Sequence, residues 1–276
     1  MRAPSLRATE AALRLVRWAN ALTAAAGVAV GAWWAGWRDP RAIALAALAA
    51  IGLTAAANAW NDLADIAIDL TAHSDRPLPS GAISPGAAER IAMTAATLAT
   101  ICASAVSVTL GVCSVLVLLL MRLYSPWLKR SGATGNLVVS VLASLPFLYG
   151  AYAAGNAARA LPLVLIAIPL HLARELAKDL DDREADRASR RTVPIVAGVF
   201  HARVAIVIAL AAAGCALAFS LAPLVKSESL LLAALIPART ARAFATARAL
   251  LGRPGSPAFF KLAMVSAMAA LLVARA

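Results

Sequence analysis

Long apolar runs alternate with short polar segments along almost the whole chain. A membrane-spanning helix needs about 20 predominantly apolar residues. By this measure the pattern predicts nine spans, at 16–36, 41–60, 86–105, 106–123, 137–155, 160–177, 203–222, 229–249 and 258–274. Breakers such as Asp39-Pro40 and Ser84-Pro85 separate most spans, whereas the third and fourth have almost no loop between them. We therefore expect an all-α, polytopic transmembrane bundle that forms a single domain over residues 1–276.

Composition and charge support a membrane protein and argue against a nucleic-acid-binding one. Of the 276 residues, 62% are hydrophobic and 14% are charged, against about 45–50% and about 25% in soluble domains. The net charge is +12, but all except five of the 26 Lys and Arg residues fall on one predicted side of the membrane, together with the N-terminus. Such an excess marks the cytoplasmic side. We expect a multi-pass protein of the cell membrane with a cytoplasmic N-terminus, no nucleic-acid partner and no evident protein partner.

The acidic residues form two clusters that are far apart in the sequence. Of the 14 Asp and Glu residues, five lie in 62–89 and six in 175–186, and both segments are predicted on the cytoplasmic side. The residues between the first acids favour a continuing helix, on which Asn61, Asp65 and Asp69 would share one face at a spacing of four. Two carboxylate-bearing helix ends are therefore expected at one membrane surface.

The second acidic segment shows the same spacing of four, in the pairs Glu175/Asp179 and Asp182/Asp186. Like charges four residues apart destabilise a helix, and placing a charge in the membrane costs roughly 2–3 kcal/mol or more. Bound cations would offset both costs. Mg²⁺ is commonly held by one or two carboxylates together with substrate phosphate oxygens. The two segments therefore predict a Mg²⁺–diphosphate site, and the alternative is a pair of solvated acidic loops.

Cationic and polar residues accompany the acids and are candidates for binding a leaving diphosphate. They are Asn58, Arg76, Tyr124, Lys129, Asn136, Arg174 and Lys178. For Lys129 the alternative is ordinary positive charge on the cytoplasmic side, and for Tyr124 it is an aromatic residue at the membrane interface.

These residues resemble the motifs of a known family, the UbiA superfamily of membrane prenyltransferases. Its first motif is similar to Asn61-Asp62-x2-Asp65-x3-Asp69 followed by Arg76-Pro77-Leu78-Pro79-Ser80-Gly81. Its second is similar to Arg174-Glu175-x2-Lys178-Asp179-x2-Asp182-x3-Asp186. One departure is Asp75, because the family often has Asn at that position. The order of the motifs and the predicted helices extend the resemblance over most of the chain.

The resemblance implies a UbiA-like fold and a Mg²⁺-dependent alkyl transferase of the EC 2.5.1 type, which ionises an allylic prenyl diphosphate. It implies metal ligands at Asn61, Asp65, Asp69, Glu175, Asp179, Asp182 and Asp186. It implies catalytic roles for Tyr124, Lys129 and Lys178, and substrate binding by Asn58, Arg76, Asn136 and Arg174. The implied partners are a prenyl diphosphate, a lipid-like acceptor and membrane lipids.

The acceptor has more than one interpretation. The second motif and Tyr124-x4-Lys129 resemble the ether-lipid branch of the superfamily, which transfers a geranylgeranyl group to the hydroxyl of geranylgeranylglyceryl phosphate. Aromatic or chlorophyllide-type acceptors in quinone or pigment synthesis are the alternative. An ion-coupled transporter is a further alternative, but it is expected to place ionisable groups near mid-span in related halves. The acids here cluster at one surface, and we find no internal repeat.

Overall fold

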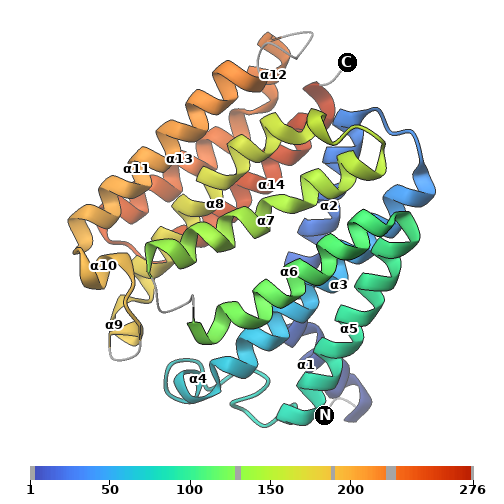
Figure 1. The fold of residues 1–276 in the computed structure, drawn as a ribbon. Coiled ribbons are helices and arrows are strands. Elements are labelled where there is room, and N and C mark those ends of the chain that lie inside the picture. The colour runs from blue at the N-terminus through green and yellow to red at the C-terminus, as the bar shows by residue number, and fades with distance from the viewer. Residues whose placement is uncertain (1–3, 128–131, 188–189, 222–227, 275–276) are drawn as a thin grey trace. The chain divides into compact units, whose positions relative to one another are not determined.

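The computed structural model describes residues 4–127, 132–187, 190–221 and 228–274, and the regular elements in these ranges are all helical (Figure 1). The chain forms two compact units. Unit 1 comprises residues 1–28 and 39–128, and unit 2 comprises residues 29–38 and 129–276. The helix α2 (Trp18–Ala35) begins in the first unit and ends in the second. Each acidic motif therefore belongs to a different unit.

Unit 1 is built around a tightly packed helix pair. Its helices besides α2 are α1 (Pro4–Val16), α3 (Pro40–Ala64), α4 (Ile66–Ala72), α5 (Pro85–Val106) and α6 (Val108–Trp127). α3 packs along α5, and α6 packs against both. Small residues allow this approach, because a Cβ atom added at Gly52 would lie 2.7 Å from the Ala95 carbonyl oxygen. Proline and side-chain caps start both α3, at Asp39, and α5, at Ser84.

Unit 2 packs around the helix that carries the second motif. Its elements are α7 (Ala133–Ala153), η2 (Ala157–Ala160), α8 (Leu161–Asp181), α9 (Arg183–Asp186), α10 (Val193–Val196), α11 (Val199–Ala216), the π-helical turn η3 (Leu217–Leu221), α12 (Glu228–Ala234), α13 (Ile236–Leu251) and α14 (Ser256–Ala274). α8 contacts α7, α11 and α14. Leu176, Ile206 and Phe260 form part of the buried core between these helices. The core thereby fixes α8 up to the residues where its carboxylates begin.

Several helices are long and apolar enough to cross a membrane. Five described helices meet this condition by length and composition, or six if the bent pair α1–α2 is counted as one span. Within the described ranges, the nine predicted spans fall mostly on helical residues, and the chain breaks at Ser107, which is extended, close to the predicted boundary between the third and fourth spans. The eighth predicted span is divided at Leu235 into α12 and α13. The all-α polytopic fold is confirmed, and the number nine is approximate.

Candidate functional site

The first motif lies where α3 ends and α4 begins. Asp65 separates the two helices with φ −97° and ψ 2°, away from helical values. The prediction of one continuing helix was therefore wrong. The hydrogen bonds nevertheless run on through the break, from Asp65 N to Asn61 O (3.1 Å) and from Asp69 N to Asp65 O (2.9 Å). The helix is thus interrupted at an aspartate, while helical hydrogen bonds continue on both sides of it.

Two carboxylates of the first motif are buried and paired with arginines. Arg17 Nη2 lies 2.6 Å from Asp62 Oδ1, and Arg76 Nη1 lies 2.6 Å from Asp69 Oδ2. Asp62, Asp65 and Asp69 are 4%, 5% and 2% exposed. A buried carboxylate is strongly unfavourable unless it is paired, so these arginines allow the acids to remain in the helix bend. The carboxylate of Asp65 lies beside Asn61 instead, whose Nδ2 is 3.4 Å from Asp65 Oδ2.

The second motif lies at the end of α8. Asn136 on α7 donates a hydrogen bond from Nδ2 to Asp179 Oδ2 at 2.7 Å, so two predicted site residues meet. Arg174 and Glu175 form an ion pair. Asp182 then separates α8 from α9, with φ −87° and ψ 2°. Asp186 follows one turn later, is 3% exposed and pairs with Arg190 at 3.3 Å.

The two motifs share one local construction. In each, the middle aspartate (Asp65 or Asp182) breaks a helix with nearly the same dihedral angles, and the acid four residues later is buried against an arginine. The underlying sequence is Asp-x2-Asp-x3-Asp in both units. The likeness is confined to these short segments, 62–69 and 179–186, and is not a repeat of whole halves. Each unit presents a carboxylate at a helix break, next to an anchored one.

The structure describes two of the remaining predicted residues, Lys178 and Asn58, in full. Lys178 is half-buried on α8, and its carbonyl oxygen accepts from Asp182 N at 2.9 Å. Asn58, half-buried on α3, donates to the Val16 carbonyl oxygen at 3.0 Å and so fixes the end of α1. Tyr124 lies on α6, but its side chain is outside the described part, and Lys129 is outside the described residues altogether.

The donor chemistry of both motifs fits Mg²⁺. Within the described ranges, no three Asp, Glu, His or Cys side chains are grouped closely enough to hold a metal ion by themselves. Mg²⁺ does not need such a cage, because substrate phosphates and waters normally complete its octahedron. The carboxylates at the two helix breaks, Asp65 and Asp182, are hard oxygen donors of this kind. Each unit therefore carries a donor that fits Mg²⁺, with a second buried carboxylate four residues further along the chain, Asp69 in unit 1 and Asp186 in unit 2.

Sequence reasoning missed several partners of the acids. Arg17 and Asp62 were not predicted as a pair, and Arg190 was not predicted at all. Arg190 was recognisable, since it lies four residues after Asp186, which is ion-pair spacing on a helix. Asp181 has a structural contact instead, because its Oδ2 accepts from Gly255 N at 2.7 Å.

Each unit also contains a cavity. The cavity of unit 1, about 360 Å³, adjoins the first motif and has Arg14, Arg17 and Asp62 in its lining. The cavity of unit 2, about 270 Å³, is largely apolar, with Leu170 of α8, Phe260 of α14 and Arg242 of α13 in its wall. Of these two cavities, only that of unit 1 has residues of a motif, Asp62 and Arg76, in its lining.

Comparison with known proteins gives a consistent result. Residues 21–272 match the family described as "UbiA prenyltransferase family". The chain is 38% identical over 203 residues to the digeranylgeranylglyceryl phosphate synthase of Methanopyrus kandleri, which covers 73% of this chain and 75% of the relative. It is 36% identical over 221 residues to the synthase of the same name from Ignicoccus hospitalis. The match covers 77% of this chain and 72% of that relative.

Solved structures share the fold. A UbiA homologue from Aeropyrum pernix K1 has a TM-score of 0.80 at 22% identity, covering 93% of this chain and 98% of that one. A UbiA homologue from Archaeoglobus fulgidus, solved with DMAPP and Mg²⁺, has a TM-score of 0.68 at 18% identity, covering 93% and 98%. At these identities the likeness concerns the fold.

Proposed function

The chain belongs to the UbiA prenyltransferase family, and we propose that it transfers a geranylgeranyl group to the hydroxyl of geranylgeranylglyceryl phosphate. The donor would be geranylgeranyl diphosphate, and the product an ether lipid. The observation that carries this proposal is the identity of 38% and 36%, over about three quarters of the chain, to two digeranylgeranylglyceryl phosphate synthases. The family alone supports prenyl transfer, and these relatives support the choice of acceptor.

The construction of the two motifs supports a diphosphate donor held with Mg²⁺. We assign Asn61, Asp65 and Asp69 in one unit, and Glu175, Asp179, Asp182 and Asp186 in the other, to the metal-bound diphosphate. When bound, Mg²⁺ would neutralise the phosphate oxygens and make the diphosphate a better leaving group. A related fold solved with DMAPP and Mg²⁺ is consistent with this assignment. We also propose that both units act as one catalytic domain.

The other assigned residues would act on charge and position. Arg76, with its guanidinium already on Asp69, and Lys178 on α8 would offset the negative charge that develops on the leaving oxygen. Tyr124 and Lys129 are assigned the same role, while Asn58, Asn136 and Arg174 would position the groups around them. The C1–O bond to the diphosphate breaks, the acceptor oxygen bonds to C1, and the hydroxyl proton is released. Atoms and charge balance without an added oxidant or reductant.

An assay with several acceptors tests the proposal. Purified protein is supplied with geranylgeranyl diphosphate and Mg²⁺, and with geranylgeranylglyceryl phosphate, 4-hydroxybenzoate or a chlorophyllide. Mass spectrometry of the lipid extract should find the digeranylgeranyl ether only with the glycerol phosphate, together with one released diphosphate per product. Prenylation of 4-hydroxybenzoate or the chlorophyllide instead would contradict the proposed acceptor.

We further propose that this multi-pass protein resides in the cell membrane with its N-terminus and both motifs in the cytoplasm. The support is the asymmetric distribution of Lys and Arg between alternate loops. Single cysteines at Ser74 and at Ala158, in a background lacking Cys102, Cys113 and Cys215, test this with a membrane-impermeant maleimide. We expect labelling of Ser74→Cys in inside-out vesicles only and of Ala158→Cys in right-side-out vesicles only, and the reverse pattern would refute the orientation.

A further inference from the structure

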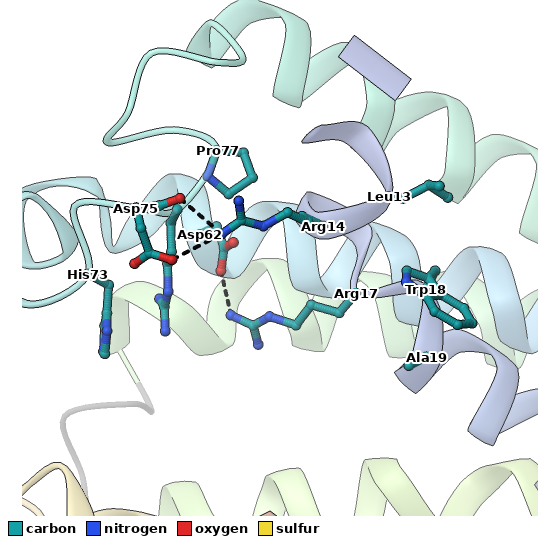
Figure 2. Close-up of a pocket in the computed structure, with 10 residues that line it drawn as sticks. Leu13, Arg14, Arg17, Trp18, Ala19, Asp62, His73, Asp75 and Pro77 are labelled. Carbon is teal, nitrogen blue, oxygen red and sulfur yellow. Dashed lines mark hydrogen bonds and ion pairs between the residues drawn. The ribbon is translucent and has the colours of Figure 1, made fainter. Parts of the chain in front are cut away.

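The cavity of unit 1 has one polar and one apolar end. Figure 2 shows His73, Asp75 and Asp62 towards one end and Leu13 and Trp18 at the other. The guanidinium groups of Arg14 and Arg17 point from the apolar end towards the acids. Leu13 and Trp18 are both exposed. The cavity therefore offers cationic groups and an apolar surface side by side, which suits a lipid with an anionic headgroup.

An unusual backbone conformation places Arg17 in this cavity. Arg17 has φ +50°, in the left-handed region that non-glycine residues seldom adopt, and α1 and α2 meet there at an angle of 50°. Its side chain contacts Asp62 at 2.6 Å and Asn58 at 3.5 Å, while Asn58 holds the Val16 carbonyl oxygen at 3.0 Å. Strain of this kind persists only where the surroundings enforce it, and it is concentrated at functional sites.

Arg14 lies on α1, three residues before Arg17, and its side chain extends to the polar end of the cavity. Its Nη2 lies 3.0 Å from both the carbonyl oxygen and Oδ2 of Asp75. The side chains of this pair are 51% and 78% exposed, so the pair adds little to stability. A guanidinium has five N–H donors, and these contacts leave Arg14 with others to offer. The lining also includes Arg17 and Arg76, which are paired with the buried Asp62 and Asp69, so Arg14 is the arginine whose carboxylate partner is exposed.

We propose that this cavity binds the phosphate headgroup of the acceptor, with Arg14 and Arg17 as its ligands and Leu13 and Trp18 against the start of its apolar chain. The inference rests on the proposed function, in which the acceptor is a phosphate monoester. The carboxylate-rich motifs repel such a monoester unless metal is bound, so the acceptor needs cations of its own. Bidentate contacts from arginine suit a phosphate group. The neighbouring first motif would then receive the donor.

Steady-state kinetics with Arg14→Gln tests the proposal, because Arg14 is exposed and its loss should not unfold the protein. We expect the KM for geranylgeranylglyceryl phosphate to rise about tenfold or more, with an unchanged KM for geranylgeranyl diphosphate and an unchanged thermal unfolding temperature. Arg38→Gln removes an exposed arginine outside the cavity and should change neither KM. With geranylgeranylglycerol, which lacks the phosphate, Arg14→Gln and the wild type should be equally poor.

A second variant distinguishes headgroup binding from a purely structural role of the Arg14–Asp75 ion pair. Asp75→Asn removes the charge of the ion pair but leaves Arg14 and its contact with the Asp75 carbonyl oxygen in place, so it should not raise the acceptor KM. If Asp75→Asn has the same effect as Arg14→Gln, or if Arg14→Gln raises both KM values equally, the subsite is refuted. Equilibrium binding of geranylgeranylglyceryl phosphate without donor distinguishes the two proposals. Binding by the wild type that Arg14→Gln weakens supports the subsite even where no product forms, which would refute only the proposed function.

Discussion

At the scale of single residues, the acids depend on arginines that lie near or far in the sequence. Asp186 and Arg190 are four residues apart, so that pair was within reach of sequence reasoning. Asp62 and Arg17 are 45 residues apart, and Asn136 and Asp179 are 43 apart. No local spacing indicates such partners. The sequence therefore predicted these acids as candidates, but not which groups compensate for their burial.

The pair Asp69–Arg76 gives a prediction about stability. Arg76→Gln should lower the free energy of unfolding by about 2–3 kcal/mol, because it leaves a buried carboxylate unpaired. The value is below that for a fully buried pair because Arg76 is 27% exposed. Adding Asp69→Asn removes the charge and should restore part of the loss. Thermal unfolding in detergent measures both, and a double variant no more stable than Arg76→Gln would contradict this explanation.

At the scale of helices, apolar periodicity predicted where the chain is helical but not where it bends. The breaks at Asp65 and Asp182 need a change of ψ at a single residue, and the hydrogen bonds continue on both sides. The pattern of apolar positions does not indicate a change of ψ at a single residue. The same holds at Leu235, where α12 and α13 meet within an apolar stretch.

The close pairing of α3 with α5 gives a second prediction. A Cβ atom at Gly52 would lie 2.7 Å from Ala95 O and 2.8 Å from Ala99 Cβ, so Gly52→Ala must push the helices apart. We expect a loss of about 1–3 kcal/mol in the free energy of unfolding. Gly214→Ala on α11 is the matched control, since its Cβ would meet nothing within 4 Å. Equal destabilisation by both changes would show that packing at Gly52 is not the cause.

At the scale of the whole molecule, composition and charge predicted a membrane bundle with its acids in two segments. They did not predict that these segments belong to two compact units. The division follows from which helices pack on which, and similar Ala-rich surfaces carry little information about that choice. The candidate site is thus predictable as a set of carboxylates, whereas its arginine partners and the cavity at Arg17 come from tertiary structure.

The proposed function requires both motifs to bind one prenyl diphosphate together with Mg²⁺. The most direct test is calorimetric binding of geranylgeranyl diphosphate without acceptor, in Mg²⁺ and in EDTA. It compares the wild type with Asp65→Ala, Asp182→Ala and the control Asp181→Asn. The control keeps a side-chain oxygen that can accept the hydrogen bond from Gly255 N. We predict metal-dependent binding by the wild type and Asp181→Asn, and at least about tenfold weaker binding by each of the other two. Wild-type affinity in Asp65→Ala or Asp182→Ala, or undiminished binding in EDTA, would contradict the claim.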